Sequence, residues 1–483
     1  MKDLEDKDVC WSVCETCQGR GKKSRRIRKK IKLQYQKAVA LFRQTEMLGL
    51  APVPPKGHLY DCLVCKGSGL VLSGVFPETN IKDYPHVAII GGGIGGIAVA
   101  IGCLHRGIPF TLYERDCDFE TRSQGYGLTL QQASKAIDGL GILSLDEGVV
   151  STRHVVHSID GEVIGEWGIR KWLKAGGEKS NKRTNIHIAR QALRSALLKQ
   201  LGSVGVQWNH KLVDLQQCEV GVEMTFEVGG AMKAAKADLV IGADGIRSSV
   251  RKLILSDHVT PLRYLGCIVI LGICPLAKLV GLDSPLLDSA TVFQTSNGNE
   301  RIYMMPYDSE SIMWQLSFPM SEKEAKALSV QGAHALKEEA CLRTLWHDPI
   351  PQILKATGEV HVSGYPVYDR ELLSSGLLAK VGDVTLIGDA AHPMSPFKGQ
   401  GANQAILDAL ALVRGISRAC NSSSNWSEVG LRKSVLGDFE SEMLARSSSK
   451  VKGSAEAAEF LHSDIVLHKG DEPRGRCIDR KDV

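Results

Sequence analysis

The stretch that decides the fold reads VAIIGGGIGG and covers residues 87–96. A short apolar strand leads into a glycine-rich turn, and the apolar residues that follow predict a helix over 94–105. Gly91, Gly93 and Gly96 occupy the positions of a G-x-G-x-x-G pattern. The first glycine allows a tight turn, the second lets a pyrophosphate approach the backbone, and the third lets helix and strand pack closely. The stretch therefore predicts a βαβ unit that binds a dinucleotide.

An acidic residue follows the next predicted strand, residues 109–113. Glu114 stands 18 residues after Gly96, and a carboxylate at this place can accept hydrogen bonds from a ribose diol. A glycine-rich turn without a ligand is the alternative, but the strand, the helix and the correctly spaced acid disfavour it. We predict that Glu114 and the adjacent Arg115 contact the dinucleotide.

Two later turns narrow the choice of cofactor. Residues 237–251 read as a strand that runs into a Gly-Ala-Asp-Gly turn containing Asp244. Residues 384–393 read as a strand that runs into Gly388 and Asp389. Each Asp ends a sheet strand at the edge where doubly wound folds bind ligands. Either turn alone could be an ordinary strand ending, whereas three such strand ends in this order predict FAD.

The remaining pattern predicts an α/β protein: a Rossmann-like FAD domain, an inserted antiparallel sheet that binds the substrate, and a small N-terminal zinc-binding module with a helical arm. We place the boundaries as follows: the cysteine-rich module at 1–80, the first part of the FAD domain at 84–260, the antiparallel sheet at 261–370, the second part of the FAD domain at 371–415, and a C-terminal helix and tail at 416–483.

The composition and the N-terminal residues argue against a membrane-spanning protein and against a secreted one. The 483 residues are 43% hydrophobic and 23% charged, with a net charge of +5, which is ordinary for a globular chain. No apolar run reaches the roughly 18 residues that span a bilayer, and the charged residues 1–8 lack the apolar core of a signal peptide. The 13 cysteines are odd in number and mostly scattered, which favours reduced thiols. We expect a cytoplasmic protein without a transmembrane segment.

The sequence resembles a known family over roughly residues 84–414: the class A FAD-dependent monooxygenases of the para-hydroxybenzoate hydroxylase type. The branch with the tetracycline-inactivating and salicylate-type enzymes is the most similar. The most specific stretch is GDAAHPMSPFKGQGANQA at residues 388–405. The resemblance implies that Asp389, after Gly388, holds the ribityl chain of FAD. It also implies that Asp244 lies near the pyrophosphate, where NAD(P)H docks transiently.

The same resemblance implies further contacts with the flavin. Arg190 belongs to an Arg-x-x-Leu-Arg helix whose arginine contacts the flavin side. Gly401, Ala402 and Asn403 correspond to a helix start that faces the pyrimidine ring. A helix N-terminus there would stabilise the negative charge of reduced flavin at N1 and O2. Pro396 corresponds to the proline beside the reactive edge of the isoalloxazine.

The catalytic candidates are Pro396, His392 and Tyr303, with Tyr307 on the same predicted side. Tyr303 could instead be a core aromatic residue on a strand, and His392 could only cap its turn. Flavin halogenases carry a Trp-x-Trp-x-Ile-Pro sequence where this chain has WQLSFP at residues 314–319, which lacks the second Trp and the Ile. Halogenase chemistry is therefore disfavoured.

The resemblance implies an FAD-dependent monooxygenase. NAD(P)H would reduce FAD, O₂ would add at flavin C4a, and the distal oxygen would hydroxylate a small aromatic or polycyclic substrate in a site that excludes water. The single nucleotide fingerprint indicates that the nicotinamide binds transiently. The substrate, the choice between NADH and NADPH, the acid or base, and the oligomeric state stay open. A flavin reductase of isoprenoid double bonds is a weaker alternative.

Two copies of Cys-x-x-Cys-x-Gly-x-Gly stand near the N-terminus. They cover residues 14–21 and 62–69 and resemble the zinc-binding cysteine-rich region of DnaJ-type chaperones. Four thiolates complete a tetrahedral Zn²⁺ shell, and the predicted ligands are Cys14, Cys17, Cys62 and Cys65. Reduced free thiols and a redox-active pair are the alternatives. An alternative function follows: a flavoprotein that senses or acts on a protein partner recruited through this module.

The segment between the two pairs is basic. Residues 20–32 hold nine Lys/Arg and no acid, and apolar residues recur at three- and four-residue spacing over 27–42, which predicts an amphipathic helix. A solvated helix face is the simplest interpretation. An acidic protein, an anionic membrane surface and a nucleic acid are the partners that would fit the charge, and nucleic acid ranks last because no aromatic residues are interleaved with the basic ones.

Overall fold

The computed structural model describes residues 10–44, 52–55, 57–122, 125–142, 144–174, 185–202, 204–420 and 425–474. The charged segment 1–8 and the residues after 474 lie outside this set. The chain divides into two compact units, Met1–Glu78 and Thr79–Val483. Among the described residues, no helix combines the length and the apolar character needed to cross a membrane.

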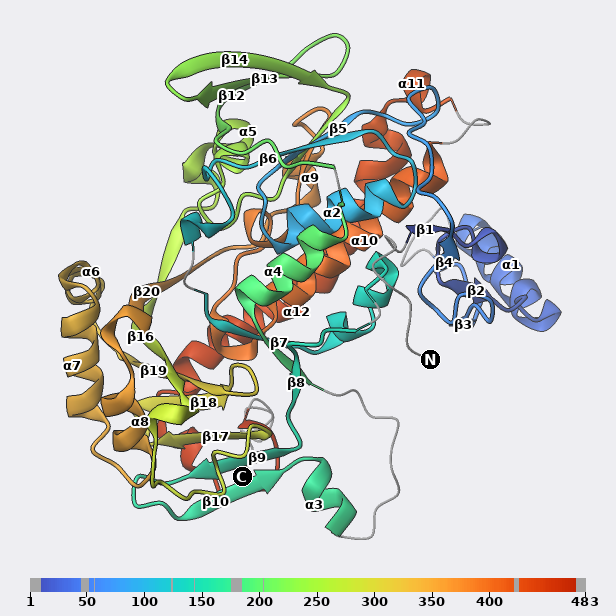
Figure 1. The fold of residues 1–483 in the computed structure, drawn as a ribbon. Helices are drawn as coiled ribbons and strands as arrows, with labels where there is room; N and C mark the ends of the chain where they lie inside the picture. The colour runs from blue at the N-terminus through green and yellow to red at the C-terminus, as the bar shows by residue number, and fades with distance from the viewer. Residues whose placement is uncertain are drawn as a thin grey trace. The chain divides into compact units, whose positions relative to one another are not determined.

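The described part of the N-terminal unit contains two short antiparallel strand pairs, one α-helix and a short 3-10 helix, η1 (Glu15–Cys17) (Figure 1). Strand β1 (Cys10–Val13) pairs with β4 (Leu70–Ser73), and β2 (Lys22–Ser24) pairs with β3 (Leu59–Asp61). Helix α1 (Lys29–Gln44) stands between β2 and β3 in the chain, close to the amphipathic helix predicted over 27–42. The β2–β3 pair therefore closes the base of an arm that carries α1.

The larger unit is built on a four-stranded parallel sheet with the order β21-β15-β5-β6. Its strands are β21 (Val384–Leu386), β15 (Leu239–Gly242), β5 (Val87–Ile90) and β6 (Phe110–Tyr113). Every residue of β5 and β15 is buried, which explains their continuous apolar sequence. The predicted strands and the first βαβ unit are confirmed to within one or two residues.

Helices cover one side of this sheet, where α2 (Ile94–Leu104) packs against α4 (Arg190–Lys199) and α10 (Gly401–Ala419) (Figure 1). A small antiparallel sheet contacts β5 and α5 (Ser249–Val259). It consists of β12 (Lys211–Gln217), β13 (Val222–Val228) and β14 (Ala231–Ala237). A third small sheet joins β7 (Gly127–Leu130), β11 (Ile186–Ala189) and β8 (Val149–Val150).

A seven-stranded sheet forms the second layer, with strands in the following spatial order: β10 (Val163–Trp167), β9 (Arg153–His157), β17 (Thr291–Ser296), β18 (Arg301–Pro306), β19 (Ser311–Pro319), β16 (Leu262–Pro275) and β20 (Val362–Arg370). The expected sheet over 261–370 is present, but it also takes in β9 and β10, and β17 runs parallel to β9. It is thus a mixed sheet rather than a purely antiparallel one. The pairing joins strands more than 100 residues apart in sequence, which local patterns do not reveal.

The two faces of the seven-stranded sheet have different neighbours. One face buries Trp314, Phe318 and Phe293 with the helices α6 (Glu322–Gln331), α7 (Ala333–Arg343) and α8 (Ile350–Ala356). Because side chains alternate along a strand, the other face presents the intervening residues of β18 and β19. That second face lines the main cavity of the molecule. The predicted C-terminal helix is α12 (Gly437–Phe460).

Candidate active site

Two adjoining cavities lie at the carboxyl ends of the parallel strands. The larger has a volume of about 880 Å³ and the smaller about 230 Å³. They share lining residues, which are Gly93, Arg190, Ala243, Gly245 and Arg247. This position at the strand ends is the one that doubly wound folds use for ligands.

The glycine turn fits the close approach of a ligand. Gly91 has a φ of +111°, and a Cβ there would lie 2.6 Å from the carbonyl oxygen of Ala243. A Cβ at Gly96 would lie 1.9 Å from the carbonyl oxygen of Gly91, so helix α2 and the turn can pack only around a glycine. By contrast, a Cβ at Gly93 would meet no atom within 4 Å. The turn therefore leaves open space at the position where a pyrophosphate would approach.

Glu114 and Arg194 hold this turn in place. One Glu114 carboxylate oxygen accepts a hydrogen bond from the Gly92 N–H at 2.6 Å, and the other accepts one from the Asp116 N–H at 3.0 Å. Arg194 Nε donates to the carbonyl oxygen of Gly92 at 2.8 Å. Each carboxylate oxygen has a second lone pair, so Glu114 can still accept bonds from a ribose diol. Arg115 lines the same smaller cavity with an exposed side chain.

Asp244 lies in the wall of the smaller cavity, but the protein itself uses its carboxylate. One oxygen accepts from the Ser248 hydroxyl, and the other accepts from the N–H groups of Ser249, at 2.7 Å, and Val250, at 3.2 Å. The side chain thus caps the start of α5. Its predicted place near a pyrophosphate stays a prediction, and the geometry gives it a role in shaping the turn.

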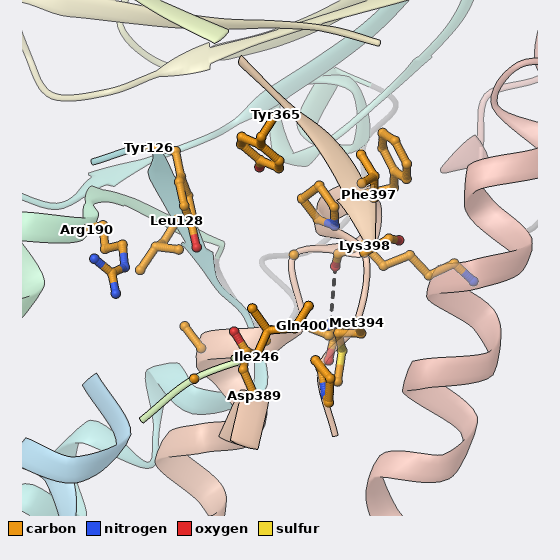
Figure 2. A pocket seen from close by; sticks show the side chains of 18 of the residues that line it. Tyr126, Leu128, Arg190, Ile246, Tyr365, Asp389, Met394, Phe397, Lys398 and Gln400 are labelled. Atoms are coloured by element: carbon orange, nitrogen blue, oxygen red, sulfur yellow. Dashed lines mark hydrogen bonds between the residues drawn. The ribbon is translucent and has the colours of Figure 1, made fainter. Parts of the chain in front are cut away.

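Asp389 stands in the larger cavity across from Arg190 and Tyr126 (Figure 2). Burial raises the pKa of Asp389, and the charges of His392 and Arg190 oppose this rise. The Arg190 guanidinium lies 5.9 Å from the centre of the Tyr126 ring. Gly388, beside Asp389, has a φ of +55°, which keeps the turn tight. A carboxylate in this place can accept hydrogen bonds from the hydroxyl groups of a polyol chain.

A buried ion network behind Asp389 was not predicted from the sequence. Asp408 on α10 accepts from the Gly388 N–H at 2.8 Å and lies 2.7 Å from His392 Nε2. Its other oxygen accepts from Arg446 on α12 at 2.7 Å. Burial opposes the charge on His392, but the neighbouring Asp408 outweighs it and raises the pKa of His392. His392 does not line the cavity, so its side chain orients the loop through Asp408.

The start of α10 forms the floor of the larger cavity. Gly401 and Ala402 line it, and the first N–H groups of a helix have no partner within the helix. The Asn403 side chain is fully engaged: its oxygen accepts from the N–H groups of Gln131 and Ala133, and its nitrogen donates to the carbonyls of Thr129 and Gly399. Asn403 therefore fixes the loops around the helix start instead of facing the cavity.

Pro396 lines the larger cavity within a short turn, η8 (Pro396–Lys398). The preceding Ser395 donates a hydrogen bond to the carbonyl of Ser454 on α12, which anchors the turn. Figure 2 shows Phe397 and Lys398, which belong to the same turn, and Tyr365 above them. The three predicted catalytic residues therefore differ in their access to the cavity. Pro396 and Tyr303 line it, and His392 does not.

The opposite wall is the free face of the seven-stranded sheet. Arg301 pairs in register with Ser317, and Tyr303 pairs with Gln315. Arg301 is only 5% exposed, its Nε donates to Gln294 at 2.8 Å, and its guanidinium lies 4.9 Å from the centre of the Tyr303 ring. Burial lowers the pKa of Arg301 to about 10 and raises the pKa of Tyr303. Sequence reasoning selected Tyr303 and missed Arg301.

Arg301 has an unusual environment for a buried cation. Within the described part of the chain, no carboxylate lies within ion-pair distance of its guanidinium. Buried charges in proteins are normally paired, because an isolated one loses its hydration without compensation. The residue lines the larger cavity, so a ligand there can supply the missing acceptor.

The four N-terminal cysteines converge in their own unit. All four sulfurs lie within 4.8 Å of one another, with Cys14 Sγ 4.0 Å from Cys62 Sγ and Cys17 Sγ 3.7 Å from Cys65 Sγ. Zn–S bonds of about 2.3 Å in a tetrahedron place sulfurs about 3.8 Å apart, so the donor set fits Zn²⁺. The N–H groups of Gly21 and Gly69 each donate to a cysteine sulfur at 3.2 Å.

Comparison with known proteins agrees with this geometry. A family model described as "FAD binding domain" matches residues 84–426, which begin after the N-terminal unit. The chain is 26% identical over 426 residues to a probable FAD-dependent monooxygenase of Arthroderma benhamiae, covering 80% of this chain and 94% of the relative. It is 27% identical over 336 residues to aurachin C monooxygenase/isomerase of Stigmatella aurantiaca, covering 68% and 80%.

Solved structures share the fold. HpxO of Klebsiella pneumoniae, complexed with FAD and uric acid, aligns with a TM-score of 0.63 at 20% identity, covering 79% of this chain and 88% of that chain. The 2,6-dihydroxypyridine-3-hydroxylase from Arthrobacter nicotinovorans aligns with a TM-score of 0.64 at 19% identity, covering 78% and 93%. At these identities the likeness concerns the fold.

Proposed function

The chain belongs to the FAD binding domain family and is an FAD-dependent monooxygenase, and from this premise we propose that it uses NAD(P)H and O₂ to hydroxylate a small aromatic or polycyclic substrate. The observation that carries the proposal is the continuity of the two cavities. The glycine turn and Glu114 line the smaller one, and Asp389 and the start of α10 line the larger one. The cavities together offer one site for the cofactor and, against the sheet, room for a second molecule.

The residues present fit FAD. Gly91 and Gly93 would accommodate the pyrophosphate, Glu114 the ribose, and Asp389 the ribityl hydroxyls. The N–H groups at the start of α10 would stabilise negative charge on the flavin ring. When bound, FAD supplies the electron transfer and the activation of O₂ that side chains cannot perform.

The chain's own part in the reaction is to orient the substrate and to exclude water. Apolar and aromatic side chains from separate elements enclose the larger cavity, among them Met305, Met313, Tyr126 and Tyr365. A dry wall of this kind protects a reactive intermediate from water. Within this wall, Tyr303 and Arg301 offer the polar groups that would orient a substrate.

Arg301 suggests a narrower substrate class. We expect the substrate to present a carboxylate, or another anionic or strongly accepting group, to the Arg301 guanidinium. In R301Q, salicylate should bind about tenfold or more weakly, because a hydrogen bond to a charged group is lost. Salicylamide, its neutral counterpart, should bind within about twofold of wild type on the same principle. Binding is measured by titrating the FAD-loaded protein and following the flavin absorbance.

A control for this test is K323Q, at the exposed start of α6, which should change neither affinity. If wild type binds salicylate no better than salicylamide, or if R301Q weakens both equally, Arg301 does not select an anion. R301M should unfold close to the temperature of wild type, because removal of the buried charge favours the folded state while loss of the hydrogen bond to Gln294 opposes it.

The proposed reaction is tested with the full chain. The purified protein should carry FAD and should oxidise NAD(P)H faster when a substrate is present, with little H₂O₂ released. A panel of hydroxylated aromatic and polycyclic compounds provides the candidates, and H₂O₂ is quantified in parallel. FAD-loaded protein that shows no acceleration with any compound would contradict the proposal. Product formed without O₂ consumption would indicate a reductase instead.

We also propose that Cys14, Cys17, Cys62 and Cys65 bind Zn²⁺ and that this unit acts in the cytoplasm. The closeness of the sulfurs favours zinc over scattered free thiols. A second candidate function, a flavoprotein that acts on a protein partner recruited through this unit, predicts that C14S/C17S loses the partner in a pull-down. Unchanged binding in that variant would count against it.

A further inference from the structure

Helix α1 (Lys29–Gln44) is a 16-residue helix with no buried residue among those it contains. An isolated helix of about this length is only marginally stable in water, because most helical stability in proteins comes from packing of an apolar face. The arm therefore presents a helix that would gain stability from a surface that covers it.

The helix has a distinct apolar face. At 3.6 residues per turn, Ile31, Tyr35, Ala38 and Phe42 fall on one stripe. Ile31 is 42% exposed, although it is one of the most apolar residues of the helix. The basic residues occupy the remaining arc, and they are Lys29, Lys30, Lys32, Lys37 and Arg43. The cationic groups thus lie away from the apolar stripe, while the exposed Leu33 falls among them on the opposite side.

The charge of the arm has one sign. Residues 20–44 contain 11 Lys/Arg and no Asp or Glu. Among the described residues, one of these basic side chains forms an ion pair with a carboxylate. It is Lys22, whose Nζ lies 2.6 Å from Asp61 Oδ1 at the base of the arm. The partner that complements the arm must therefore be anionic over an extended area.

We propose that α1 docks on an anionic lipid bilayer, with its apolar stripe in the headgroup region and its basic residues against the lipid phosphates. A basic amphipathic helix with low overall hydrophobicity and aromatic residues on its apolar face has the composition of interfacial helices. A nucleic acid would neutralise the charge but leave the apolar stripe in water. The membrane satisfies both features, and the cytoplasmic leaflet is negatively charged.

The arm that carries α1 is joined to its unit through a strand pair. Strands β2 and β3 pair at its base, and the Lys22–Asp61 ion pair lies across that pair. A bilayer-bound arm would hold the enzyme where apolar polycyclic molecules accumulate. The docking itself, however, is independent of the reaction that the larger unit catalyses.

The test is co-sedimentation of the full FAD-loaded chain with phosphatidylcholine vesicles, either pure or containing about 30% phosphatidylserine. Wild type should bind the anionic vesicles and not the neutral ones, and raising NaCl from about 0.1 to about 0.5 M should release it. The charge variant K29E/K30E/K32E and the apolar variant I31S/Y35S should each lower the partition coefficient about tenfold or more.

The matched control is K323E/K380E/K433E, which makes the same change of charge on exposed lysines of the larger unit and should bind like wild type. Circular dichroism and FAD content check that every variant is folded. Absence of binding to anionic vesicles, equal loss in the control, or full binding by I31S/Y35S would each overturn the proposal. Tighter binding to a transfer RNA than to the vesicles, lost in the charge variant, would assign the arm to nucleic acid instead.

Discussion

Replacing Asp408 by alanine should lower the free energy of unfolding of the larger unit by about 3–5 kcal/mol, because it leaves the buried His392 without its anion and takes from Arg446 one of its two carboxylate partners. Asp408 is 0% exposed and contacts His392 and Arg446 through different oxygens. It also accepts from the Gly388 N–H, next to Asp389. The loss should therefore loosen the loop that holds Asp389 and weaken FAD binding as well.

The measurement is denaturant unfolding of D408A, with the affinity for FAD determined by fluorescence quenching. D438A, at the exposed start of α12, is the matched control and should stay within about 0.5 kcal/mol of wild type. D408N should lose less than D408A, since an amide oxygen still accepts from Gly388. Equal stability of D408A and D438A would mean that the network contributes nothing to the loop.

The network also gives the stability a defined pH dependence. Because the pKa of His392 is raised in the folded protein, its contribution is fully present below the ordinary histidine pKa and is lost as the pH rises through the raised value. The pKa of Asp408 is lowered by His392 and Arg446 against the effect of burial, so its contribution is lost as the pH falls through the lowered value. H392Q should therefore be less stable than wild type at low pH, and the free energies of unfolding of the two proteins should become equal at high pH.

The parts of the site that depend on local backbone geometry could be predicted from the sequence. The turn at Gly91 requires a positive φ and a close approach to Ala243, and these demands restrict the residue type at single positions. Strand β5 accordingly begins and ends at the predicted residues. A pattern of this kind is readable because the cause and the residue lie together in the chain.

Features that depend on pairing between distant segments could not be predicted. Arg446 and Asp408 are 38 residues apart and meet only because α12 packs against α10. The lack of a carboxylate near Arg301 among the described residues could not be predicted either, since it depends on which residues the fold brings close to the guanidinium. Strand β9 joins the seven-stranded sheet through β17, and its sequence alone does not specify that partner.

The sequence indicates where a residue lies more readily than which groups its side chain contacts. The sequence pattern predicted Asn403 and Asp244 as cofactor contacts; in the structure Asp244 lines the smaller cavity, whereas Asn403 lines neither cavity and follows Ala402, which lines the larger one. Yet the Asn403 amide holds the loops at Thr129 and Gly399, and the Asp244 carboxylate caps α5. A residue type fixed by such internal hydrogen bonds gives the same sequence signal as one that contacts a ligand.

Removal of Cys17, one of the four proposed Zn²⁺ ligands, should unfold the N-terminal unit. The described strands of this unit are short; its buried cluster consists of the four cysteines with Val71 packed against them, and Cys10, Trp11 and Leu70 are buried besides. A core of this size cannot stabilise a fold, whereas structural Zn²⁺ contributes about 10–16 kcal/mol of apparent binding free energy in small zinc-binding peptides. C17S should therefore lose the bound zinc, and hydrogen exchange over residues 10–44 and 59–73 should become fast. FAD content should be unchanged.

The control is C117S, an exposed cysteine of the larger unit, which should retain one zinc per chain. A strong chelator should reproduce the effect of C17S in wild type, and acidification should do the same because the cysteine thiols must lose their protons to bind the metal. If wild type contains no zinc and its four thiols oxidise reversibly to disulfides, the redox interpretation replaces the metal site. The glycines give a second check: a Cβ at Gly21 would lie 2.0 Å from the carbonyl oxygen of Gly67, so G21A should lower zinc affinity while all four sulfur ligands remain.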